Sequence, residues 1–123
     1  MPLITESDAR SFAMHGSTFT SFVAPTAGST QLCAWRLDVV PGTTGVPHRV
    51  SHEEVLLVLE GELLMDLDGV ALRAAPGETI FVPAGSSVAV AGGLSGARAW
   101  VTTSVGLTAT TGDGGVITPP WTQ

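Results

Sequence analysis

The chain carries few side chains that are able to do chemistry. Its 123 residues include three histidines (His15, His48 and His52), one thiol (Cys33) and eleven carboxylates. It contains no lysine and no tyrosine, which excludes Schiff-base chemistry and phenolic acid–base chemistry. Imidazole, carboxylate and thiol groups remain, and these groups act as acids, bases, metal ligands or nucleophiles.

The segment from 42 to 61 contains two of these side chains, His48 and Glu54, between a glycine at each end. It reads glycine, five residues, His48, one residue, Val50, three residues, Glu54, six residues, glycine. Positions 48 and 50 share one face of a strand, ~7 Å apart. Two histidines at that spacing can converge on one metal ion, although position 50 is valine here.

A second segment, from 77 to 92, reads glycine, five residues, Pro83, one residue, Gly85, two residues, Val88, three residues, glycine. Together the two segments resemble the two motifs of the cupin family, and the likeness covers about residues 32–92. The resemblance implies an all-β fold, the double-stranded β-helix or jelly-roll barrel, with six to eight strands and a site inside the barrel.

The resemblance also implies a metal site that is degenerate in this chain. The family carries histidines at the positions of Val50 and Val88, where they join His48 and Glu54 in binding a metal. Two protein ligands seldom hold a divalent ion, so we expect neither a metal nor a cofactor. His52 is the nearby substitute ligand, and a site made of His48, His52 and Glu54 stays open as an alternative.

Within such a barrel, Glu54 would face the two valines, where its charge is costly unless a partner compensates it. His48 is the expected partner, as an imidazolium–carboxylate pair or a pair that shares one proton. Apolar surroundings raise the pKa of a glutamate, whereas a neighbouring imidazolium lowers it. A pair of this kind inside a cavity is a candidate functional site.

The leading hypothesis for function is a metal-independent binder of a small, partly apolar molecule. Apolar walls that include Val50 and Val88 would hold the molecule, and His48 and Glu54 would fix its polar end. His52 and Trp100 are further candidate contacts, and Trp35 is an alternative pocket floor. His15 is expected on the surface, and Cys33 is expected to fill the core.

Three other functions stay open, so the sequence does not decide whether the chain is an enzyme. One is a metal-independent isomerase or cyclase in which Glu54 and His48 are the general base and acid. Another is a metal-dependent enzyme that uses His48, His52 and Glu54 as ligands. The last is a scaffold without a cavity that only associates with itself.

Composition limits the partners. Eleven acids oppose five arginines, giving a formal net charge of −6, which argues against nucleic acid because that affinity comes from cationic side chains. No apolar run reaches the ~18–20 residues of a membrane helix, and a single cysteine fits a reducing compartment. We therefore expect a cytoplasmic protein without membrane contact, and the resemblance implies a homodimer.

The length fits a single domain over 1–123 with an irregular N-terminal segment, 1–15, and a C-terminal tail, 112–123. A short helical turn is expected after Thr5 or Ser7, and the VITPPW sequence of the tail is expected to pack onto the domain. Between them, alternating apolar runs bounded by glycine, proline or aspartate predict strands. The predicted strands are Phe19–Val23, Leu32–Val40, Val55–Leu59, Leu63–Leu67, Thr79–Val82, Val88–Ala91 and Ala99–Val105.

Overall fold

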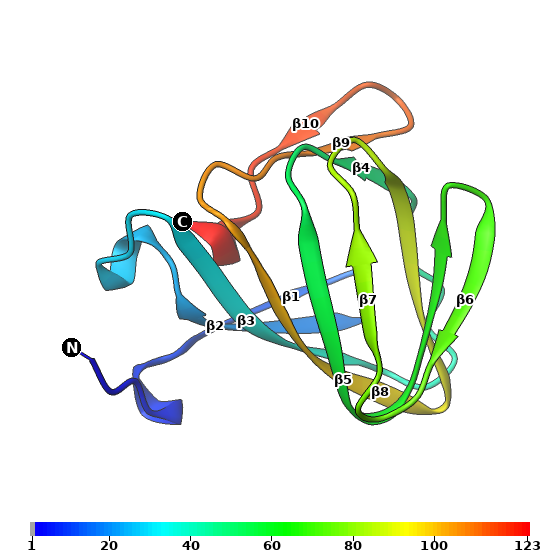
Figure 1. Ribbon diagram of the computed structural model, residues 1–123, viewed down its shortest axis with the longest axis horizontal. Helices are drawn as coiled ribbons and strands as arrows, with labels where there is room; N and C mark the ends of the chain where they lie inside the picture. Colours follow the sequence, from blue (N-terminus) through cyan, green and yellow to red (C-terminus); the bar gives the residue numbers. More distant parts are fainter. Residues whose placement is uncertain (1) are drawn as a thin grey trace.

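A computed structural model describes residues 2–123 (Figure 1); Met1, which the predicted N-terminal segment includes, lies outside them. The described residues form strands with three short 3-10 helices, η1 (Glu6–Asp8), η2 (Pro25–Ala27) and η3 (Pro120–Thr122). The strands are β1 (Arg10–Met14), β2 (Ser17–Val23), β3 (Leu32–Val39), β4 (His48–Val50), β5 (Glu54–Leu67), β6 (Val70–Ala74), β7 (Thr79–Val82), β8 (Ser87–Ser104), β9 (Ala109–Thr111) and β10 (Val116–Ile117). None of the helices in this part of the chain has the length and apolar character needed to cross a membrane.

All pairings between these strands are antiparallel, and the sheet curls around the interior. One path runs β1-β2-β3-β8-β4-β9-β10, while β5 pairs with β6, β7 and β8. In Figure 1, β5 to β8 form one wall, β4, β9 and β10 lie together at the top, and both chain ends lie on the left. The all-β prediction is confirmed, with ten strands over residues 2–123 in place of the six to eight that the resemblance implied.

Two long, bent strands join the walls of the barrel. The sequence predicted separate strands on either side of residues 60–61, but β5 continues through this point with register shifts against β8. Gly61 has a φ of 72°, and a Cβ there would lie 2.2 Å from the carbonyl oxygen of Gly96. The glycine that the pattern suggested as a strand end is therefore a bend at which two backbones meet. In the same way β8 runs continuously through Gly92.

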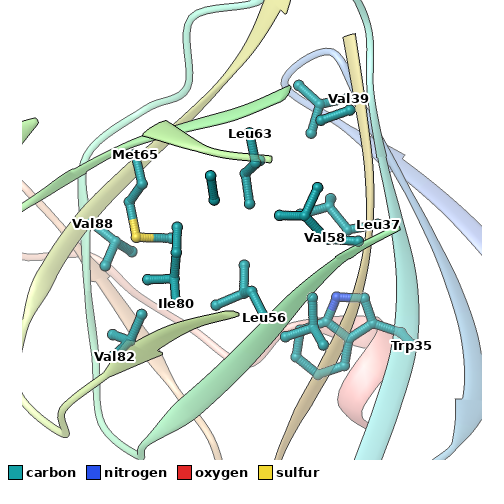
Figure 2. Close-up of a cluster of buried hydrophobic side chains, with 14 of the residues drawn as sticks. Trp35, Leu37, Val39, Leu56, Val58, Leu63, Met65, Ile80, Val82 and Val88 are labelled. Atoms are coloured by element: carbon teal, nitrogen blue, oxygen red, sulfur yellow. The ribbon is translucent and has the colours of Figure 1, made fainter. Parts of the chain in front are cut away.

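The core lies inside the curled sheet, where side chains of β3, β5, β7 and β8 meet (Figure 2). The predicted inner face of β3 is confirmed, because Cys33, Trp35, Leu37 and Val39 are all buried. Arg36 and Asp38, in the other register, form ion pairs on the outer face. Alternation along the strand thus assigned both faces correctly.

The chain ends are more ordered than the sequence predicted. The helical turn after Thr5 is confirmed as η1, but residues 10–14 of the supposedly irregular segment form β1, which pairs with β2. Its mixed polar and apolar residues hid it, since β1 lies at the edge of the sheet and is only partly buried. The tail packs onto the domain as expected, and Trp121 is 8% exposed.

Candidate functional site

A cavity of about 110 Å³ lies inside the barrel. Its deep part is lined by buried apolar side chains, which include Trp35, Leu37, Val50, Leu56, Val101 and Leu107. Its outer part is lined by exposed or half-buried residues, so the cavity opens to solvent there. We call this outer part the mouth; it consists of His15, Val46, His48, Thr111 and Ile117.

One wall of the cavity is aromatic. Phe19 of β2 stacks on Trp121 of η3, with ring centroids 3.6 Å apart and an angle of 6° between the planes. Trp35 of β3 meets Trp121 edge to face, with centroids 6.4 Å apart. The Ser21 hydroxyl holds this arrangement by donating a buried hydrogen bond of 2.8 Å to the Trp121 carbonyl oxygen. The C-terminal segment is therefore a fixed part of the cavity wall.

Glu54 begins β5 and is the acidic side chain in the cavity lining. It is 9% exposed, and within residues 2–123 no ion pair or hydrogen bond holds its carboxyl group. Burial in these apolar surroundings raises the pKa of Glu54 from 4.5 to about 7, because desolvation disfavours the charged form. At neutral pH the group is thus present both as a proton donor and as a proton acceptor.

His48 begins β4 and lines the same cavity. Its Nδ1 lies 3.0 Å from the carbonyl oxygen of Val46. A carbonyl oxygen only accepts, so Nδ1 carries the proton, and in a neutral ring Nε2 keeps its lone pair. The expected ion pair between His48 and Glu54 is not formed among the described residues. His48 instead donates to Val46, in the loop before its own strand, and Glu54 has no partner among residues 2–123.

Of the six predicted contact residues, the structure brings three together in the cavity: His48, Val50 and Glu54. Val88 is buried and lies opposite His48 in the β4–β8 pair, but it does not line the cavity.

His52 and Trp100 also lie away from the cavity lining. The Nδ1 atom of His52, in the connection between β4 and β5, is 2.7 Å from the hydroxyl of Ser104. Trp100 packs against Phe22 on the outer face of the sheet, with ring centroids 5.3 Å apart. Of the two tryptophans considered as a pocket floor, Trp35 rather than Trp100 lines the cavity.

The residues present do not fit the metal of the family pattern. Val50 and Val88 offer no donor atom, and His52 does not join His48 and Glu54 in the lining. In the described part of the chain, no three His, Cys, Asp or Glu side chains are grouped so that they could hold an ion. The structure therefore gives no support to a metal site of His48, His52 and Glu54.

Sequence reasoning missed the lining residues that lie outside the two motifs. His15 is exposed, as expected, but it also stands at the cavity mouth, while Phe19 and Trp121 supply the aromatic wall. The proline pair before Trp121 indicated that the tail packs, but nothing in the sequence indicated where. Those three contributions depend on the topology, which brings the β1–β2 hairpin and η3 to the cavity.

Comparisons with known proteins agree with this architecture. A family model described as the cupin domain matches residues 35–91. The polyketide cyclase RemF from Streptomyces resistomycificus superposes with a TM-score of 0.75 at 22% identity, covering 85% of this chain and 79% of that one. KdgF from a Halomonas species gives 0.70 at 16% identity, covering 82% and 90%. An RmlC-like cupin from Shewanella frigidimarina gives 0.69 at 22% identity, covering 81% and 86%.

The domain match and the shared fold identify the class: this chain contains a cupin domain match over residues 35–91 and has the cupin fold. The predicted jelly-roll fold is thereby confirmed. No curated protein matches the sequence significantly. At these identities the solved structures establish the fold and not the activity.

Proposed function

We propose that this cupin binds a small, partly apolar organic molecule in its cavity without a metal ion. The observation that carries the proposal is a buried carboxyl group, Glu54, that has no partner among the described residues and lies in an otherwise largely apolar cavity. Leaving a buried polar group unsatisfied costs ~1–3 kcal/mol. A ligand that hydrogen-bonds to Glu54 would remove that penalty, which is a reason for such a group to stand in a binding cavity.

Each part of the cavity has a role in this function. The aromatic wall of Phe19, Trp35 and Trp121 gives a planar or apolar body its contact area. Glu54 donates or accepts a hydrogen bond in the deep part, and His48 offers a second polar contact nearer the mouth. These contacts fix the orientation of the ligand, while the apolar area supplies most of its affinity.

The test is a titration with p-cresol, which combines one ring with one hydroxyl group. Trp35 and Trp121 line the cavity, so binding should change tryptophan fluorescence in a saturable manner and raise the melting temperature. Glu54→Gln should alter the affinity, whereas Glu53→Gln, an exposed neighbour outside the lining, should not. If p-cresol and comparable neutral ring compounds leave both signals unchanged, the proposal is wrong.

A second candidate function is a metal-independent isomerase or cyclase; the raised pKa of Glu54 and the hydrogen bond from His48 Nδ1 to the Val46 carbonyl oxygen favour it. Protonated Glu54 can give its proton to a carbonyl oxygen while an Nε2 lone pair of His48 takes a proton from the adjacent carbon, which yields an enol. These roles reverse those expected from the sequence, because Nδ1 of His48 carries the ring proton. RemF is a polyketide cyclase, but its likeness to this chain extends to the fold alone.

Exchange of α-hydrogen for deuterium tests this second candidate. Acetophenone in deuterated buffer should exchange its methyl hydrogens ~10²–10⁴-fold faster with the wild-type protein than without protein. Glu54→Gln should abolish the acceleration and Glu53→Gln should keep it. An acceleration that survives in Glu54→Gln would exclude the mechanism. A failure of exchange together with normal p-cresol binding would leave a binder and no enzyme of this type.

Three expectations from the sequence stay proposals. We propose a homodimer, no nucleic-acid partner and a cytoplasmic location, on the grounds of the family resemblance, the net charge of −6 and the single cysteine. Light scattering after gel filtration tests the homodimer, with a mass of twice 12.6 kDa as the expected result.

A further inference from the structure

His15 stands at the cavity mouth in a strained backbone conformation. With Gly16 it forms the two-residue turn of the β1–β2 hairpin, in which Met14 pairs with Ser17. The two turn residues have φ values of 51° and 78°, as a type I′ turn requires. A left-handed conformation costs an L-residue other than glycine about 1–2 kcal/mol, and asparagine, rather than histidine, is the usual first residue of such turns.

The hairpin tip is held in place by the loop after β3. The Val40 amide donates a hydrogen bond of 3.3 Å to the Gly16 carbonyl oxygen. A Cβ at Gly16 would lie 2.7 Å from Cγ2 of Thr43, so the tip and the loop are in close contact. The surrounding structure thus holds His15 in its strained conformation. Residues held in such conformations cluster at functional sites.

Among residues 2–123, His15 and His48 are the two that line the cavity and can carry a positive charge. Both belong to the mouth, whereas the one lining carboxyl group, Glu54, is buried. A ligand carboxylate beside Glu54 would meet a like charge in apolar surroundings, which is unfavourable. An acidic ligand therefore enters with its acid group toward the mouth and its apolar body inward.

We propose that His15, together with His48, binds the acid group of a small aromatic acid whose ring occupies the cavity and whose second polar group meets Glu54. The proposal rests on the binding function proposed above. A cavity of about 110 Å³ is close in size to the ~150 Å³ apolar cavity that takes up benzene, so a single six-membered ring matches it. The aromatic wall favours a planar ring over a branched aliphatic body.

Calorimetric titration with 4-hydroxybenzoate and p-cresol tests the proposal, since the two probes share ring and hydroxyl group and differ in the carboxylate. The variant is His15→Asn, because asparagine tolerates positive φ and keeps the turn. The matched control is His52→Asn, a histidine outside the cavity lining. Melting temperatures of both variants check that the fold is kept.

The wild-type protein should bind 4-hydroxybenzoate about tenfold more tightly than p-cresol, the size of one charge-assisted hydrogen bond. His15→Asn should lose most of that advantage while its p-cresol affinity stays unchanged, and His52→Asn should behave as wild type. Equal affinities for both probes, no effect of His15→Asn, or an equal loss in His52→Asn would overturn the role of His15 and leave the binding function intact. Absence of binding by either probe to the wild-type protein would overturn both.

Discussion

Phe19 and Trp121 lie face to face with ring centroids 3.6 Å apart, although one belongs to the second strand and the other is the third residue from the end of the chain. The contact joins η3 to the β1–β3 side of the barrel and forms one wall of the cavity. The packing of the C-terminal segment and one wall of the cavity therefore depend on the same pair of rings.

Replacing Trp121 by alanine should lower the free energy of unfolding by ~3–5 kcal/mol, the usual cost of removing a buried large aromatic side chain. The same change at Trp100, which is half-buried on the outer face against Phe22, should cost clearly less. Urea unfolding followed by circular dichroism measures both values. Equal losses of unfolding free energy in the two variants would show that Trp121 stabilises the fold no more than a tryptophan on the outer face does.

Much of the fold could be predicted from the sequence because the alternation of side chains along a strand is a local feature. Alternation in β3 assigned Trp35 to the core and Arg36 to the outer face, and both assignments are confirmed. The glycine at position 61 was recognised but interpreted as a strand end. Only the register of β5 against β8 shows that it is a bend, and that register is a long-range property.

The site could be predicted only in part. His48, Val50 and Glu54 lie within one short motif and do line the cavity, whereas Trp100 faces outward in its strand. The wall formed by the tail depends on contacts between opposite ends of the chain. No periodicity or spacing in the sequence encodes such contacts.

Glu54 should make the stability depend on pH in a specific window. Below about pH 4.5 the carboxyl group is protonated in both the unfolded and the folded chain. As the pH rises to about 7, the unfolded chain ionises while the folded group keeps its proton, so folding loses stability. The shift corresponds to about 3 kcal/mol, and above pH 7 the loss stays constant.

Glu54→Gln removes this titration, so its stability relative to wild type should increase by up to about 3 kcal/mol between pH 4.5 and 7. Denaturant unfolding across that range measures the difference. Glu53→Gln, at an exposed position, serves as the control and should show no such trend. A difference between Glu54→Gln and wild type that does not vary with pH would contradict the burial of an unpartnered carboxyl group.

Gly61→Ala should prevent folding or destabilise the protein severely, because the new Cβ would lie 2.2 Å from the Gly96 carbonyl oxygen at a φ of 72°. Gly69→Ala offers a matched control, since Gly69 has a φ of 84° but no atom within 4 Å of the added carbon. It should cost only the ~1–2 kcal/mol of the left-handed conformation. Soluble yield and urea midpoints compare the two, and similar midpoints would show that the bend in β5 can move.

Val50→His should place a third potential metal ligand in the cavity beside His48 and Glu54. Val50 lines the cavity with His48 and Glu54, and three protein ligands are the usual number at catalytic zinc sites. We expect the variant to bind about one zinc ion per chain in calorimetric titration, with a rise in melting temperature on zinc addition. The double variant Val50→His, Glu54→Gln has the same new imidazole but lacks the carboxylate ligand, so its zinc affinity should be much lower. Equal zinc binding by the single and double variants would mean that Glu54 is not a zinc ligand. If neither variant binds zinc, the side chains at positions 48, 50 and 54 do not converge on one point.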